Sequence, residues 1–366
     1  MAAWACGTGV STATPEVQLA AASQSQSGAP PAPVDLHACD QLKFGTAGDG
    51  RLYDVLPPAG SRVWCDPGTS DAAGTMAVVV QMEKDYLYKR QAFFFDTSGA
   101  TLSTREGHWL TVAPKKRGFF VAEYELDGQG RGFGLWALDG KGLLQATLFN
   151  DINVLGTLIS GSSGRVEALT SSGAMGSLGT LSSFDAEGRS TFTTATAEGC
   201  HWLDSLGNTI GPEGWMDTQG KMVSRANIFA GPTPARSATS FEPRIGGGFF
   251  VHVTDVDLKV SRWVAQIDSL ARDSTPAPAF LAKRPETRLR IIKGGAGYAL
   301  LPLAGACSQT VEILTANGQS CGFVSFPDIA GACSTSSLDV GLDGTVIQAL
   351  PASSGCGWRY WPAFFQ

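Results

Sequence analysis

The chain has 366 residues, of which 43% are hydrophobic, so it can bury the core of one large domain or two ordinary ones. Only 16% of the residues are charged and the net charge is -6, which argues against a nucleic-acid partner, because such a partner requires a basic surface. No apolar run reaches the roughly 18 residues of a membrane-spanning helix.

Residues 1–38 predict a disordered tether, because they are rich in Ser, Ala and Pro and have few apolar anchors. A small residue precedes Cys6, a glycine follows it, and a flexible polar stretch comes next. This arrangement resembles the start of a mature bacterial lipoprotein, although Ala3 stands where that family usually has Leu. The resemblance implies a lipid on Cys6 and an extracytoplasmic protein that is held at an outer membrane or cell surface, or is periplasmic or secreted. The alternative is an ordinary disordered terminus with a free thiol.

From residue 39 onward the strongest pattern is a repeat, in which a glycine opens a short apolar run and a chain-reversal signal follows about twenty residues later. The steps between these glycines are 44, 46, 35, 49, 49 and 47 residues. A four-stranded propeller blade needs about 40–50 residues. The glycines are Gly74, Gly118, Gly164, Gly199, Gly248, Gly297 and Gly344.

The unit from Gly118 to Leu148 shows the pattern within one repeat. Residues 118–121 and 134–138 predict two apolar strands, and residues 143–148 predict an outer strand. Between the last two, the run from Asp139 to Gly142 predicts a hairpin turn, because Asp can accept a backbone hydrogen bond and Gly can adopt a positive φ.

The repeat predicts an all-β fold, a single β-propeller over residues 39–366, with seven blades as the preferred count and six or eight left open. The period is too short for an immunoglobulin-like array and too long for a β-helix. The 35-residue step, around residues 191–215, is the weakest part of the pattern. The spacing is similar to that of bacterial extracytoplasmic β-propeller repeat proteins, which implies an exported protein.

The two chain ends are predicted to meet. We expect the segments Arg51–Leu56 and Arg62–Cys65 to complete the C-terminal blade, with disulfides fixing the closure. Proximity in sequence favours a bond between Cys39 and Cys65, two bonds among the last four cysteines, and a free Cys200, although six cysteines admit fifteen pairings. Thiolate metal ligation is not expected, because no closely spaced cysteine pair exists. The disulfide candidates are Cys39, Cys65, Cys307, Cys321, Cys333 and Cys356.

The sequence predicts no catalytic residue, no cofactor and no metal. His201 and His252 could point towards the central channel, but neutral, hydrogen-bonded histidines are the preferred interpretation. Carboxylates across the channel could serve a glycoside hydrolase, and this carbohydrate-binding or hydrolysing propeller is the alternative function. The candidate carboxylates are Glu123, Glu125, Glu167 and Asp204.

Trp109 and Trp215 are the candidate exposed aromatics of a binding face, where they could stack on sugars or anchor a protein. The basic run Lys115–Arg117 predicts a solvated turn. The preferred function is a membrane-tethered, non-enzymatic binding or scaffold module that holds a protein partner on one propeller face.

Overall fold

The computed structural model describes residues 38–366 except for 57–60, 85–86, 127–131, 173–177, 197–200, 212–213, 225–236, 256–259, 270–273, 303–308, 328–336 and 353–354. The predicted tether before residue 38, with Cys6, lies outside the described residues, as do Gly199, Cys200, Cys307 and Cys333. Within the described part, no helix is long and apolar enough to cross a membrane.

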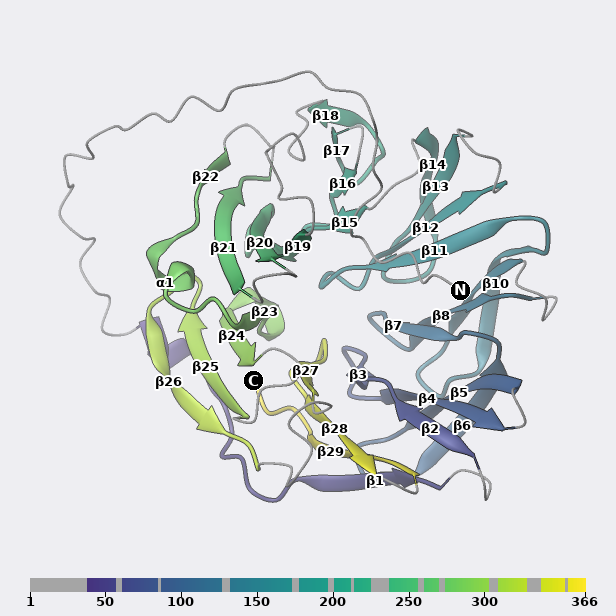
Figure 1. Ribbon diagram of the computed structural model, residues 1–366, viewed down its shortest axis with the longest axis horizontal. Coiled ribbons are helices and arrows are strands. Elements are labelled where there is room, and N and C mark those ends of the chain that lie inside the picture. Colours follow the sequence, from purple (N-terminus) through teal and green to yellow (C-terminus); the bar gives the residue numbers. More distant parts are fainter. Residues whose placement is uncertain are drawn as a thin grey trace.

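Seven antiparallel sheets surround a common axis (Figure 1). The predicted seven-bladed β-propeller is therefore confirmed. Each blade has four strands from the axis outwards, and in blade 1 two short strands share the innermost position. Three short helical segments, η1 (Ala38–Gln41), α1 (Ala279–Ala282) and η2 (Lys293–Gly295), lie between strands or before the first one.

The first four blades follow the chain order, with the innermost strand first and the outermost strand last. Blade 1 has β2 (Arg62–Cys65) and β3 (Thr69–Ser70), then β4 (Met76–Lys84), β5 (Leu87–Phe95) and β6 (Thr101–Gly107). Blade 2 has β7 (Thr111–Pro114), β8 (Phe119–Tyr124), β9 (Phe133–Leu138) and β10 (Leu144–Asp151). Blade 3 has β11 (Leu155–Ser160), β12 (Val166–Ser171), β13 (Gly179–Phe184) and β14 (Ser190–Thr196). Blade 4 has β15 (Trp202–Leu203), β16 (Thr209–Gly211), β17 (Gly214–Met216) and β18 (Met222–Ser224).

The last three blades have the same inside-to-outside order, except that blade 7 takes its outermost strand from the start of the chain. Blade 5 has β19 (Ser237–Pro243), β20 (Phe249–Asp255), β21 (Val260–Ile267) and β22 (Ser274–Pro276). Blade 6 has β23 (Thr287–Ile291), β24 (Gly297–Pro302), β25 (Thr310–Thr315) and β26 (Ser320–Ser325). Blade 7 has β27 (Ser337–Val340), β28 (Val346–Ala352), β29 (Gly355–Trp361) and, outermost, β1 (Arg51–Val55).

The repeated glycines mark the turn from the innermost to the second strand. Gly118 has φ 91°, and a Cβ atom there would lie 2.2 Å from the carbonyl oxygen of Leu138. Both the positive φ and the close approach require glycine. The second strands that follow are apolar runs because they are buried between neighbouring blades, as in β8.

The fourth blade corrects the predicted repeat. Its turn carries Gly207, with φ 86°, and not Gly199. Gly207 lies 43 residues after Gly164 and 41 before Gly248, so the short step disappears. Blade 4 keeps four strands, although each has only two or three residues.

Aspartates in these turns link consecutive blades. Asp71 accepts the N–H groups two and four residues on in its own turn, and its second oxygen accepts the N–H of Gly118 in the next blade at 2.6 Å. Asp204 repeats this arrangement with Gly248 at 2.9 Å. The same turn sequence therefore sets both the local hairpin and the spacing of the blades.

The N-terminal strand closes the ring. β1 pairs antiparallel with β29, from Arg51 opposite Tyr360 to Val55 opposite Cys356. The prediction that the two chain ends share one blade is confirmed for β1. It was wrong for Arg62–Cys65, because β2 pairs with β4 and begins the first blade.

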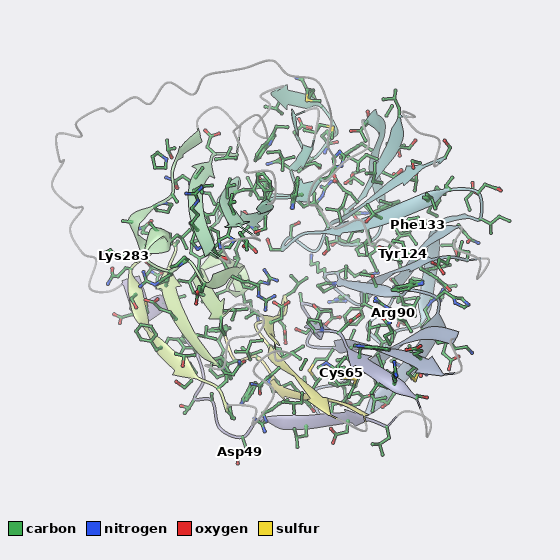
Figure 2. All side chains as sticks on the ribbon, in the orientation of Figure 1. Asp49, Cys65, Arg90, Tyr124, Phe133 and Lys283 are labelled. Carbon is green, nitrogen blue, oxygen red and sulfur yellow. A yellow bond between two sulfur atoms is a disulfide. The ribbon has the colours of Figure 1, made fainter. Side chains whose placement is uncertain are left out.

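Among the cysteines that the structure describes, two disulfides join the N-terminal region to blades 6 and 7, and they differ from the predicted pairings. Cys39 bonds to Cys321 of β26, and Cys65 of β2 bonds to Cys356 of β29. Cys65 is labelled in Figure 2. The expected bond between Cys39 and Cys65 was wrong, as was the expected pairing of Cys321 and Cys356 within the last four cysteines. Proximity in sequence misled because closing a ring brings residues 282 and 291 positions apart into contact.

Candidate functional site

The innermost strands of blades 5 to 7 carry an ion-pair network near the axis. Arg290 of β23 donates to Asp339 of β27 at 2.7 Å and to Glu242 of β19 at 3.1 Å. Arg288, two residues earlier on the same strand, donates to the carbonyl oxygen of Leu338. The Arg290 guanidinium therefore joins three consecutive blades.

This network does not have the arrangement of a glycosidase. Burial raises the pKa of Glu242, whereas attraction by Arg290 and Arg288 outweighs burial and lowers the pKa of Asp339. Opposite shifts are typical of an acid and base pair. Here, however, Arg290 lies between the two carboxylates and binds both, so a substrate would have to displace a paired guanidinium. The geometry favours a structural role.

The carboxylates selected from sequence have structural partners. Glu167 is fully buried and accepts a hydrogen bond from Thr209 of the next blade. Burial raises its pKa to about 7. Asp204 is the turn aspartate described above, and Glu123 accepts the N–H of His108 at 2.8 Å. Glu125 lies in a loop with φ 72°. Among these four, the structure assembles no pair around an open pocket.

The two histidines are buried and hydrogen-bonded, as the preferred interpretation expected. The His201 ring contacts the Thr196 hydroxyl at 3.2 Å. The His252 ring contacts the carbonyl oxygen of Pro285 at 2.9 Å and packs edge-on against Trp263, and burial lowers its pKa. Over the described ranges, no three His, Cys, Asp or Glu side chains gather in a way that could hold a metal ion.

The two tryptophans selected from the sequence differ in exposure. Trp215 is only 1% exposed and packs edge-on against Phe249, so its predicted exposure was wrong. Trp109 is half-buried in the loop between β6 and β7, has φ 53°, and lies 5.1 Å from the guanidinium of Arg90. Its role in binding stays a prediction. Lys116 and Arg117 are exposed, as expected of a solvated turn, whereas Lys115 is only 2% exposed and donates a hydrogen bond to Gln145 of β10.

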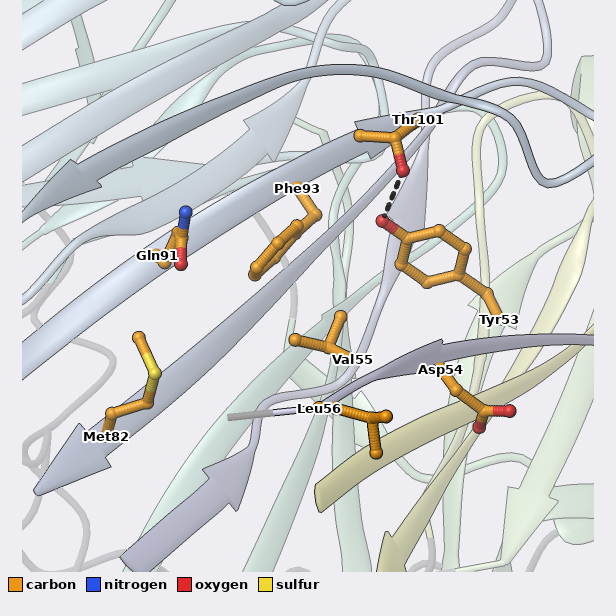
Figure 3. Close-up of a pocket in the computed structure, with 8 residues that line it drawn as sticks. All are labelled: Tyr53, Asp54, Val55, Leu56, Met82, Gln91, Phe93 and Thr101. Atoms are coloured by element: carbon orange, nitrogen blue, oxygen red, sulfur yellow. Dashed lines mark hydrogen bonds between the residues drawn. The ribbon is translucent and has the colours of Figure 1, made fainter. Parts of the chain in front are cut away.

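An open groove of about 560 Å³ lies where blade 7 meets blade 1 (Figure 3). β1 forms one wall, and β4, β5 and β6 form the other. Tyr53 connects the two walls. Its hydroxyl and that of Thr101 lie within hydrogen-bond distance, at 3.1 Å, and its ring stacks on Phe95 with the ring centroids 4.0 Å apart. The lining residues are Tyr53, Asp54, Val55, Leu56, Met82, Gln91, Phe93 and Thr101.

Apolar side chains are exposed beside this groove. Leu56 is 82% exposed and Leu52 is 58% exposed, whereas Tyr53 and Val55 on the opposite face of β1 are buried. Figure 3 shows Asp54 and Leu56 on the other side of the strand from Tyr53 and Val55. A groove of mixed lining with exposed leucines beside it is typical of a surface that contacts another protein.

Sequence reasoning missed this site. The segment Arg51–Leu56 was predicted only as a closing strand, and neither Met82 nor Phe93 was selected from the sequence. The available signal was the alternation of side chains along the segment. Since Tyr53 and Val55 lie on the buried face of β1, Leu52 and Leu56 must lie on its exposed face.

No protein-family profile and no curated protein sequence matches this chain. Among solved structures, it is similar to the β-propeller domain of the Trilobed protease from Pyrococcus furiosus, with 11% identity, a TM-score of 0.45, and coverage of 88% of this chain and 96% of that one. Prolyl oligopeptidase B from Galerina marginata, bound to a 35mer substrate, has 11% identity and a TM-score of 0.39. That match covers 84% of this chain and 42% of the other. At these identities the similarity gives no evidence of a shared activity. The seven-bladed architecture follows from the strand pairing of this chain.

Proposed function

We propose that this protein is an exported, non-enzymatic binding module that holds a protein partner in the groove between blades 7 and 1. The observation that carries the proposal is the groove itself, where apolar side chains such as Met82 and Phe93 alternate with polar ones, together with the exposed Leu52 and Leu56 beside it. The two disulfides are typical of proteins that fold outside the cytoplasm.

A photoreactive side chain at position 56 tests the proposal in the extracytoplasmic fraction of the native host. We expect one discrete cross-linked adduct that disappears when Leu52→Asp is added. Position 323 is the matched control, because Phe323 is 67% exposed on the outermost strand of blade 6. The same adducts at both positions, or none at position 56, would contradict binding in the groove.

We also propose that Cys6 carries a lipid that tethers the propeller to a membrane. The support is the sequence around Cys6 and the polar stretch that follows it. Cys6→Ser should move the protein from the membrane fraction to the soluble fraction, because a lipid chain supplies the membrane affinity. Cys200→Ser, the same substitution at another cysteine, should leave fractionation unchanged. Membrane retention of Cys6→Ser would remove the tether from the proposal.

A further inference from the structure

We propose that the partner's binding segment is an extended peptide that pairs with the free edge of β1 as a fifth strand of blade 7. This inference rests on the proposed protein-binding function and names the partner's chemistry. β1 pairs with β29 on one side, and on its other side no strand of the described ranges pairs with it. Its outward backbone groups are therefore a template for strand addition.

The regular ladder of β1 distinguishes it from most other outer strands. In blades 1, 2, 3, 4 and 6, the register between the third and the outermost strand shifts at a bulge or irregularity. Bulges bend and twist an edge and thereby protect it from added strands. The β1–β29 register runs from Arg51 to Val55 without a shift. β22, the outermost strand of blade 5, has three residues and is shorter than β1.

The groove supplies sites for one set of the peptide's side chains. Successive side chains of a strand point to opposite faces, so every second peptide residue would point towards blade 1. There it would meet Val55, Met82 and Phe93, which are apolar. Two apolar residues separated by one position fit this wall.

The opposite face of β1 selects the residue between them. Asp54 is the one charged residue among the eight that line the groove, and its side chain lies on the same side of β1 as Leu56 (Figure 3) and, by the alternation along the strand, as Leu52. A Lys or Arg fits best here, because its aliphatic stem can cover a leucine while its charge meets the carboxylate. The expected motif is apolar–Lys/Arg–apolar in an extended peptide.

A random heptapeptide library displayed on phage, selected on the full disulfide-bonded chain, tests the motif. We expect enrichment of apolar–Lys/Arg–apolar peptides whose affinity falls about fivefold with Asp54→Asn, as for an exposed ion pair. Asp54→Lys should turn the selected central residue to Glu or Asp. Phe323→Asp is the control and should change neither affinity nor motif. The proposal would be overturned if the enriched peptides lacked the apolar–Lys/Arg–apolar alternation, or if Asp54→Lys left the selected motif unchanged.

Backbone N-methylation separates strand addition from simple groove binding. Methylating alternate amides in one register removes the hydrogen bonds to β1, whereas the other register leaves them intact. We expect the peptide's affinity to fall about tenfold or more in only one of the two registers, because that register loses roughly one or two hydrogen bonds. Equal affinity of both methylated peptides would overturn strand addition, while the cross-link at position 56 would still support binding in the groove. Loss of that cross-link would instead overturn the proposed function.

Discussion

Glu167 shows how a single buried side chain sets a pH dependence. It lies between blades 3 and 4, bonds to Thr209, and has Arg165 as the nearby cation. Burial is the main reason that its pKa rises from 4.5 to about 7. The folded state holds this proton more tightly than the unfolded chain does. The protonated Glu167 therefore contributes its full share to the free energy of unfolding below pH 4.5, and this contribution is lost as pH rises through about 7.

Glu167→Gln should therefore stabilise the protein at pH 8 and change little at pH 4.5. Gln keeps an acceptor for Thr209 without a buried charge, and the shift corresponds to a gain of up to about 3 kcal/mol. Chemical denaturation at the two pH values measures the difference. Glu187→Gln, which alters an exposed glutamate, should show no comparable gain. A Glu167→Gln protein that is as pH-dependent as the parent between these values would refute the assignment.

At the scale of the element, the Asp-x-x-Gly turn does two different jobs. Asp217, in the turn between the third and outermost strands of blade 4, bonds only the N–H groups of its own turn in the described contacts. Asp204 also bonds the buried N–H of Gly248 in blade 5. Asp204→Ala should therefore cost about 3 kcal/mol, because it leaves a buried donor without a partner.

Asp217→Ala is the matched control and should cost about 1 kcal/mol, as for the loss of a local turn contact. Denaturant midpoints of the two variants measure the difference. Equal losses would show that the contact between blades adds nothing to the turn.

At the scale of the whole molecule, stability depends on the closed ring. The bond between Cys65 and Cys356 holds β2 of the first blade against β29 of the last, beside the stacked Tyr53 and Phe95. These disulfides close loops of 282 and 291 residues, and the lower chain entropy of the cross-linked unfolded state should stabilise the fold by up to about 6 kcal/mol for each.

The double variant Cys65→Ala/Cys356→Ala should unfold at a markedly lower denaturant concentration than the parent protein. Cys39→Ala/Cys321→Ala removes the other long loop and should lower the midpoint as well. With a reductant present, the parent should fall to or below the midpoints of both variants. A parent midpoint that is unchanged by reduction would show that strand pairing alone closes the ring.

The sequence by itself determined the architecture, because its cause is local. A glycine that must adopt a positive φ recurs in every blade, and an Asp-x-x-Gly turn recurs in blades 1 to 4, so spacing was enough to predict the sheets, their preferred number and the closing strand. The error at Gly199 arose where blade 4 has strands of two or three residues, too short for an apolar pattern.

Tertiary structure alone decided everything that depends on the closure of the ring. The partners of Cys39 and Cys65 lie 282 and 291 positions away along the chain, and local sequence patterns cannot predict contacts over such separations. Trp215 is buried and Leu56 is exposed because neighbouring blades cover one and leave the other open. The groove exists for the same reason, since its two walls come from a strand near residue 50 and strands near residues 80 to 100, which meet only when the last blade borrows its outer strand from the start of the chain.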